Sequence, residues 1–292
     1  MIVRGSETVL VQGITGKQGT FWAEKMRDYG TSIVGGVNPK KAGSEHLGLP
    51  VWGSAVEAAK DGGIDASVLF IPPLGVKAAA LDAIEAGIKK LVILTEHIPV
   101  QDVMYVLAAA REAGAQVIGP NTAGIVTAGE CFVGFMPAFN DRVFRPGRVG
   151  VISRSGSLGT LLCLNIVQAG MGISAFIGIG GDPISGTTTR DALIALDRDA
   201  GTDAVAMIGE IGGGMEEEAA EYAAGMSKPV AAFIAGAASP PGKKMGHAGA
   251  IVMGDRGSYA GKKAALEAAG VAVLPTPSGV PEALAERLTV AA

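Results

Sequence analysis

The chain has 292 residues, 48% of them hydrophobic, and its net charge at pH 7 is −4. This length and apolar content favour a globular protein of two domains, while the negative charge and the 5% of aromatic residues argue against binding to nucleic acid or to an anionic membrane. Only two cysteines and three histidines are present, without a Cys/His cluster, so a disulfide scaffold and a zinc site are both disfavoured.

The first half alternates short β-branched runs with helical patterns. Expected strands lie at 8–13, 32–37, 66–73, 90–96 and 115–121, and expected helices lie at 20–30, 54–63, 76–87 and 100–114. Continuous apolar runs are typical of parallel strands that are buried on both faces. The pattern therefore predicts a doubly wound, Rossmann-like domain over residues 1–125.

The pattern breaks between residues 127 and 147, where turn residues, aromatic residues and charges mix without a sustained period. We expect the domain junction here, with 126–147 as a connecting segment. The alternation of strands and helices then resumes, and it predicts a second open α/β sheet of the flavodoxin-like type over residues 148–292. The expected fold class is therefore α/β, with two domains.

A glycine-rich loop, VLVQGITGKQGTF, joins the first expected strand to the first expected helix. Its Gly13, Gly16 and Gly19 allow a tight turn and a close approach to a pyrophosphate, which the N-terminus of the helix would hold. Taken alone, the loop is better explained as a turn that serves only packing. It is not a Walker A loop, because Lys17 is followed by Gln18 instead of Ser or Thr.

The second expected strand ends in VGGVNPKKAG. Rossmann domains that bind NAD usually carry Asp or Glu at this point, which accepts hydrogen bonds from the ribose. Lys40 and Lys41 put positive charge there instead, which suits a ribose that carries a phosphate. NADP and coenzyme A are both candidate ligands, and a solvated loop explains two adjacent lysines equally well.

In the second half, GVISRSGSLGT runs from a strand into a helix. The helix N-terminus and the hydroxyls of Ser153 and Ser155 would suit a phosphoryl group, and an ordinary serine cap is the alternative. Glu210 ends a predicted strand in AMIGEIGGG, and His247 lies in the loop KKMGHAGAIV, which follows another strand. Both residues are expected at the carboxyl edge of the sheet, where open α/β sheets bind ligands.

A carboxylate that accepts one ring N–H of a histidine leaves the other nitrogen free as a nucleophile. A pair of Glu210 and His247 would therefore suit a histidine that becomes phosphorylated. For His46 and His97 we expect an ordinary surface or core-edge role. The chain has no GxSxG elbow, so a hydrolase is disfavoured.

In their order and spacing, GITGKQGTF, GGVNPKKAG, ILTEHIP, VGVISRSG, MIGEIGG and KKMGHAGAIV resemble the α subunit family of succinyl-CoA synthetase over nearly the whole chain. The resemblance implies that the first domain binds coenzyme A, that His247 is transiently phosphorylated and that Glu210 orients it. The other implied site residues are Thr15, Gly16, Lys17, Gln18, Lys41, Leu94, Thr95 and Glu96 for coenzyme A, and Ser153, Ser155 and Gly156 for the phosphoryl group.

The chain departs from the family pattern near the expected acid site. Thr160 and Leu161 stand where the family has a tyrosine that contacts the acid and a glutamate. The family's GPNCPG reads GPNTAG here, with Thr122 and Ala123, and GFMPAFNDRVFRPG is longer than its counterpart. We therefore expect coenzyme A and phosphohistidine chemistry, with Thr160 near an acid whose identity stays open.

The expected function is that of the α subunit of a nucleotide-dependent acid–CoA ligase. A β subunit with an ATP-grasp domain would bind ATP or GTP with Mg²⁺, in an αβ or α2β2 assembly, and the substrate would be a small carboxylic acid. The alternatives are a ligase for another acid such as malate, itaconate or a branched acid, a CoA-binding protein without catalysis, and an NADP oxidoreductase. The lack of a secretory signal and of a membrane-spanning run predicts a cytoplasmic protein.

Overall fold

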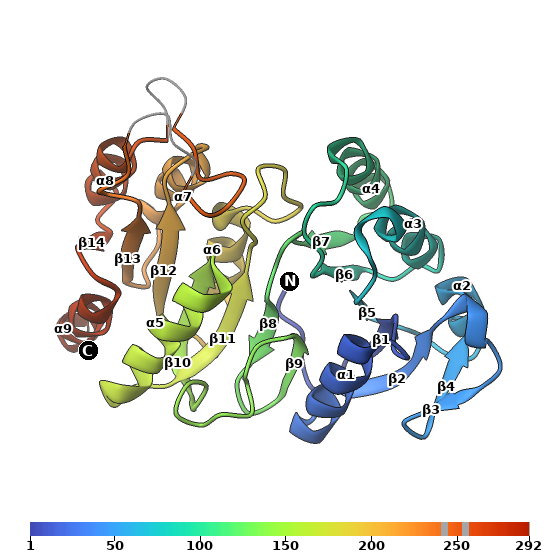
Figure 1. Ribbon diagram of the computed structural model, residues 1–292. Coiled ribbons are helices and arrows are strands. Elements are labelled where there is room, and N and C mark those ends of the chain that lie inside the picture. Colours follow the sequence, from blue (N-terminus) through green and yellow to red (C-terminus); the bar gives the residue numbers. More distant parts are fainter. Residues whose placement is uncertain (241–244, 253–256, 292) are drawn as a thin grey trace.

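The computed structural model describes residues 1–240, 245–252 and 257–291. Two seven-stranded sheets lie next to each other, the first built from the first half of the chain and the second from the rest (Figure 1). Helices flank both sheets, so the α/β class and the Rossmann-like first half are confirmed. Among the described residues, no helix is long and apolar enough to cross a membrane.

The first sheet has the strand order β3-β4-β2-β1-β5-β6-β7. All neighbouring pairs are parallel apart from β3 and β4, so the six parallel strands follow the 3-2-1-4-5-6 order of a Rossmann fold. The strands are β1 (Thr8–Gln12), β2 (Ser32–Val37), β3 (Glu45–His46), β4 (Leu49–Trp52), β5 (Ala66–Leu69), β6 (Lys90–Ile93) and β7 (Gln116–Ile118).

The helices of the first half match the expected ones except for one, which is a single turn. They are α1 (Lys17–Tyr29), α2 (Ala55–Ala58, the single turn), α3 (Val76–Glu85) and α4 (Val100–Glu112). The sequence analysis missed β3 and β4. The reason is that Gly43 and Gly48, both with positive φ, divide this stretch into segments too short to show a period.

The second sheet has the order β14-β13-β12-β10-β11-β8-β9. Its five parallel strands follow the flavodoxin-like order 2-1-3-4-5 read from β11 to β14. The strands are β8 (Gly124–Thr127), β9 (Cys131–Gly134), β10 (Pro146–Ser153), β11 (Ile173–Gly178), β12 (Ala204–Glu210), β13 (Val230–Ala235) and β14 (Ala272–Leu274). The helices are α5 (Gly156–Gln168), α6 (Thr189–Arg198), α7 (Met215–Ala223), α8 (Tyr259–Ala268) and α9 (Val280–Ala291).

The hairpin β8–β9 is the main feature that the sequence analysis did not predict. Both strands are buried throughout, so they lack the alternation of apolar and polar residues that marks a half-buried strand. They pair antiparallel with each other, and β8 also pairs antiparallel with β11, which extends the second sheet into the segment expected to be a connection. The domain boundaries at residues 125 and 148 stay a prediction.

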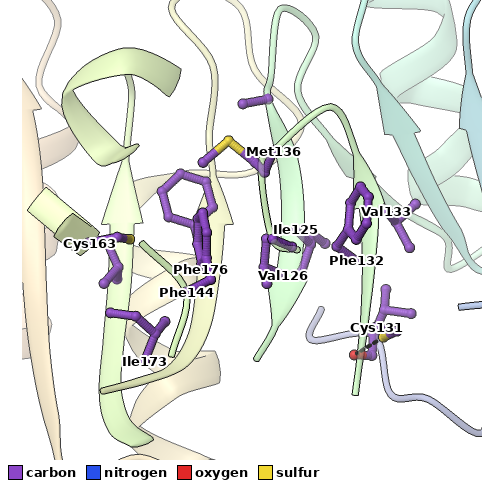
Figure 2. Packing of buried hydrophobic residues seen from close by; sticks show 14 of the residues in the cluster. Ile125, Val126, Cys131, Phe132, Val133, Met136, Phe144, Cys163, Ile173 and Phe176 are labelled. Atoms are coloured by element: carbon purple, nitrogen blue, oxygen red, sulfur yellow. Dashed lines mark hydrogen bonds between the residues drawn. The ribbon is translucent and has the colours of Figure 1, made fainter. Parts of the chain in front are cut away.

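The two sheets share an apolar core. The cluster that contains α1, β8, β9, α5 and α9 runs through both halves, whereas α2 to α4 and α6 to α8 cover the opposite sheet faces with separate clusters. Figure 2 shows this junction, where Phe144 meets Phe176 with ring centroids 5.9 Å apart. Trp22 of α1 meets Phe132 of β9 at 6.4 Å. The hairpin thus joins the first half of the chain to the second through buried side chains.

Candidate active site

The candidate residues of the second half converge where its parallel strands end. Glu210 is the last residue of β12, Arg154 directly follows β10, and His247 lies in the loop after β13. The loops at this edge lie beyond the arrowheads of β12 and β13 in the upper left of Figure 1. This is the edge at which open α/β sheets bind ligands.

His247 and Glu210 form a hydrogen bond. His247 Nδ1 lies 2.7 Å from Glu210 Oε2, and because a carboxylate can only accept, Nδ1 donates and the neutral ring keeps a lone pair on Nε2. The side chain of Glu210 is 9% exposed and that of His247 is 31% exposed, so the ring is open to solvent on one side. The hydrogen bond to Glu210 raises the pKa of His247 above its usual value, against the opposing effect of burial.

The imidazole lies directly against a glycine. A Cβ atom on Gly181, in the loop after β11, would lie 2.3 Å from His247 Cγ and 2.6 Å from Nδ1. Side chains do not approach so closely in packed interiors, so glycine leaves the room that the ring needs. Gly249 N also donates to the Gly181 carbonyl at 3.1 Å, which holds the histidine loop on this backbone. Lys243 and Lys244, which precede His247, lie outside the described residues.

Arg154 is a candidate site residue that the sequence analysis missed. Its side chain is 2% exposed, with Nη2 3.2 Å from Glu210 Oε1 and Nη1 3.6 Å from Glu216 Oε1. Nη1 also donates to the Gly212 carbonyl at 3.4 Å. A buried charge needs such partners, because an unpaired one is strongly destabilising. The available signal was a charged residue directly after a buried strand, in VISRSGS, where the sequence analysis considered only the serines.

Lys262 continues a row of alternating charges behind the histidine. Glu216 and Lys262 are both fully buried, and Lys262 Nζ donates to Glu216 Oε2. Glu217 Oε2 lies 3.3 Å from the same ammonium. Glu216 Oε1 accepts from the backbone N–H of Glu210 at 3.2 Å, so the row is bonded to the strand end that carries Glu210. We call His247, Glu210, Arg154, Glu216 and Lys262 the charge row.

The serines before α5 shape their own turn. Ser153 Oγ donates to the Ser155 carbonyl at 2.6 Å, and Ser155 caps α5 by accepting from Leu158 N at 3.4 Å. The N–H groups of the first turn, which begins at Gly156, have no helical acceptor, and such groups suit an anion. Binding of a phosphoryl group by Ser153, Ser155 and Gly156 stays a prediction, with the backbone as the better placed donor.

The loop GPNTAG of the first half reaches this site. Asn121 Nδ2 donates to Asp182 Oδ1 at 2.9 Å, and Thr122 Oγ1 donates at 2.6 Å to the carbonyl of the last residue of β11. A Cβ on Gly156 would lie 3.1 Å from the Cβ of Ala123. Ala123, one of the departures from the family pattern, therefore lies against the start of α5.

Thr160 and Leu161 lie further along α5. Thr160 Oγ1 donates to the Gly156 carbonyl at 2.8 Å, so this hydroxyl is used within the helix. Leu161 is 42% exposed. At these two positions the chain therefore has a threonine whose hydroxyl is bonded within the helix and an exposed leucine. A contact between Thr160 and the acid stays a prediction.

The residues expected to bind coenzyme A begin at the N-terminus of α1. Gly16 is the N-cap of this helix, and no side chain caps the helix end. A Cβ on Gly19 would lie 2.2 Å from the Gly13 carbonyl oxygen, so α1 packs directly on the glycine loop. Thr15 Oγ1 accepts from Asn38 Nδ2 at 2.5 Å, which joins the loop to the end of β2. The first N–H groups of α1 are thereby left without a side-chain acceptor.

The other expected coenzyme A residues lie at the same edge of the first sheet, because they follow β1, β2 and β6. Their environments differ: Lys17, Gln18, Lys41 and Glu96 are exposed, Thr95 is half-buried and Leu94 is buried. Lys41 ends a short 3-10 helix, Pro39–Lys41. Thr95 Oγ1 donates to the Ile71 carbonyl at 2.6 Å. The structure thus brings the three segments to one edge, and their role in binding stays a prediction.

The other two histidines have no buried carboxylate partner among the described residues. His46 Nε2 lies 2.8 Å from Thr20 Oγ1, and the side chain of His97 is 84% exposed. Within residues 1–240, 245–252 and 257–291, no group of three or more His, Cys, Asp or Glu residues could hold a metal ion. A cavity of about 700 Å³ lies between α4 and α6, and the charge row does not line it.

Two protein families match the chain: the CoA binding domain over residues 5–97 and the CoA-ligase family over residues 152–272. The chain is 47% identical to the α subunit 2 of the ADP-forming succinate–CoA ligase of Archaeoglobus fulgidus, over 99% of each chain. It is 44% identical to subunit SauD of the ADP-forming sulfoacetate-CoA ligase of Bilophila wadsworthia, over 96% of each. The structure of ATP citrate lyase from Methanothrix soehngenii in complex with citrate and coenzyme A aligns with a TM-score of 0.90 at 25% identity, over 99% of this chain and 51% of that one.

Proposed function

Since the chain belongs to the family of succinate–CoA ligase α subunits, we propose that it joins a small carboxylic acid to coenzyme A through a phosphorylated His247, driven by ATP or GTP. As a member, it is an acid–thiol ligase subunit of the NDP-forming type. Its first half is a CoA binding domain. The histidine, the acid and the nucleotide are the parts that this proposal adds.

The hydrogen bond between His247 Nδ1 and Glu210 Oε2, at 2.7 Å, carries the proposal. It assigns the proton of the neutral ring to Nδ1 and leaves Nε2 with a lone pair. It also fixes the ring orientation, which a nucleophile in group transfer requires. The 31% exposure of the His247 side chain leaves it accessible to a phosphoryl donor on another chain.

Three steps account for the reaction. Nε2 of His247 attacks the terminal phosphorus of the nucleotide, and the nucleoside diphosphate leaves with the electron pair of the broken P–O bond. A carboxylate oxygen of the acid then attacks the same phosphorus, the N–P bond breaks and its electron pair returns to Nε2. The thiol of coenzyme A attacks the acyl carbon of the resulting acyl phosphate, and phosphate leaves with the thiol proton. Covalent intermediates of this kind divide one difficult condensation into easier steps.

The protein's own contribution is electrostatic. Glu210 accepts the Nδ1–H throughout, so it stabilises the positive charge that forms on the ring when Nε2 bonds to phosphorus. The free N–H groups at the start of α5, which begins at Gly156, would stabilise the negative oxygens of the transferred group. Both groups are part of the folded site, so neither has to reorganise during the transfer.

A partner subunit is part of the proposal. The matched relatives are named as subunits, and no ATP-grasp segment is recognisable in this sequence. A β subunit with an ATP-grasp domain would supply the nucleotide and Mg²⁺, in an αβ or α2β2 assembly. The chain alone is therefore expected to be inactive.

Coenzyme A is proposed to bind along the carboxyl edge of the first sheet. The uncapped N-terminus of α1 offers the N–H groups of Lys17 and Gln18 to the pyrophosphate. The exposed Lys41 suits the phosphate on the ribose, and Leu94, Thr95 and Glu96 would border the rest of the molecule. The Gly13 and Gly19 backbone contact supports this fit, because any side chain at Gly19 would fill the approach to the loop.

The acid is proposed to lie near the start of α5, where Thr160 and Leu161 replace larger polar residues. The Thr160 hydroxyl is bonded within the helix, so we expect selection by size and charge. The two relatives named above act, by their names, on succinate and on sulfoacetate, which are both small dianions. Malate and itaconate are the alternatives of similar size and charge.

The test is a labelling experiment on the complex of this chain with its β subunit. With γ-labelled ATP or GTP, we expect acid-labile phosphate on the wild type and on the control variant His97→Ala, and none on His247→Ala. The labelled complex is then mixed with coenzyme A and one acid at a time: succinate, sulfoacetate, malate or itaconate. The acid that removes the label fastest is the substrate. If neither nucleotide labels a complex that still binds coenzyme A, the proposal fails and a CoA-binding protein without catalysis remains.

A further inference from the structure

Glu210 has two oxygens with two different partners. Oε2 accepts from His247 Nδ1 at 2.7 Å, and Oε1 lies 3.2 Å from Arg154 Nη2. A carboxylate bound only to a histidine would favour the imidazolium, because the ion pair stabilises the charged ring. A protonated Nε2 has no lone pair for a phosphoryl group. The site therefore has two requirements: Glu210 must orient the ring, and the ring must not become fully protonated.

Arg154 has the charge and the position to meet this need. Its guanidinium is 2% exposed, so solvent screens its interactions weakly. Its second carboxylate partner, Glu216, is itself paired with the buried Lys262. Lys262, which also contacts Glu217, offsets part of the charge of Glu216, so more of the positive charge of Arg154 remains available to balance Glu210.

The charged groups around His247 come from three elements. Glu210 ends β12, Arg154 follows β10, and Asp182 follows β11, where Asn121 holds it at 2.9 Å. Glu210 and Asp182 favour the protonated ring, whereas Arg154 disfavours it. Among the described residues that act on His247, Arg154 is thus the one cation.

We propose that Arg154 is a positioning residue for His247: it forms an ion pair with the second oxygen of Glu210 and partly balances its charge, so that Nδ1 stays bonded to Glu210 while a smaller share of the rings is protonated at Nε2. This role rests on the proposed phosphorylation of His247, and it gives the buried charge row a function. Each member of the row offsets the charge of the one before it, from Glu210 through Arg154 and Glu216 to Lys262. The arrangement separates orientation of the nucleophile from its protonation.

The direct test is the titration of His247, followed by NMR of ¹³C-labelled histidine in the αβ complex. The chain has only three histidines, so His46→Gln and His97→Gln assign two of its signals. In Arg154→Gln, we expect the midpoint for His247 to rise by about one pH unit, because the balancing cation is lost. The matched control Arg148→Gln removes a surface arginine paired with Asp203 and should leave the midpoint unchanged.

The rate of His247 phosphorylation as a function of pH is the second measurement. The rate should increase with pH as His247 loses its proton. In Arg154→Gln this increase should occur at a pH about one unit higher, so at acidic pH the rate should be about tenfold lower than in the wild type. Arg154→Lys keeps the positive charge but not the planar guanidinium group. Its phosphorylation rate should therefore increase over the same pH range as that of the wild type but reach a lower maximum at high pH. This variant decides the matter if Arg154→Gln does not fold.

The outcomes separate the two proposals. The role of Arg154 alone would be overturned if the wild type is labelled on His247 and Arg154→Gln changes neither the titration midpoint of His247 nor the pH dependence of the rate. The same holds if Arg154→Lys has the maximal phosphorylation rate of the wild type. A wild type that is never labelled would overturn the phosphohistidine and this inference together. A shifted midpoint with a matching shift of the rate supports both.

Discussion

A single methyl group added at Gly181 tests whether the placement of the His247 ring controls the reaction. The φ of Gly181 is not positive, so alanine is compatible with its backbone. The new Cβ would lie 2.3 Å from His247 Cγ and 2.7 Å from Cδ2, whereas carbon atoms in contact are about 3.5 to 4.0 Å apart. The ring must therefore move by about 1 Å, and a displacement of that size at a reacting group costs about 100-fold in rate.

The assay is the single-turnover rate of His247 phosphorylation in the complex with the β subunit, with the melting temperature measured in parallel. Gly181→Ala should lose about 100-fold in this rate while coenzyme A binding by the first half is unchanged. Gly225→Ala is the matched control, since its Cβ would meet only the Tyr222 carbonyl oxygen at 3.8 Å. A normal rate in folded Gly181→Ala would refute the argument that this glycine positions the ring.

Two further substitutions test the supporting structure. Lys262→Met leaves Glu216 buried without its ammonium partner, so we expect a loss of about 3 to 5 kcal/mol in the free energy of unfolding, measured by urea denaturation. Adding Glu216→Gln should recover part of it, and a loss below about 1 kcal/mol would contradict the view that this pair is buried and dry. Gly19→Ala places a Cβ 2.2 Å from the Gly13 carbonyl oxygen, so α1 must shift by enough to cost about 1 to 3 kcal/mol. Calorimetry should then show that coenzyme A binds tenfold or more weakly. Unchanged affinity would show that the glycine loop does not take part in binding coenzyme A.

The two sheet types could be predicted from the pattern of the chain alone. Parallel strands are buried on both faces and are joined by helices, so they leave continuous apolar runs at regular intervals. The positions of Glu210 and His247 followed from the same rule, because Glu210 ends one such run, His247 follows another, and the carboxyl ends of parallel strands share one edge. A local pattern is sufficient here, since each feature depends on its own strand.

The hairpin of β8 and β9 could not be predicted in this way. Its strands are short and buried, and they join the second sheet only by pairing with β11, about fifty residues further along the chain. In the same way, nothing near Gly181 in the sequence indicates that the ring of His247, which lies in the loop after β13, packs against this glycine.

The local features of the chain thus determined most of the parallel strands of both sheets, the glycine loop and the identity of the candidate nucleophile. The tertiary structure decided how that nucleophile is controlled. Glu216 and Lys262 are 46 residues apart, and each would be an ordinary surface charge on an amphipathic helix by its local pattern. Burial makes the pairing of Glu216 with both Lys262 and Arg154 obligatory, because charges removed from water need partners at close range. That requirement acts through space, so it leaves no period or motif in the sequence.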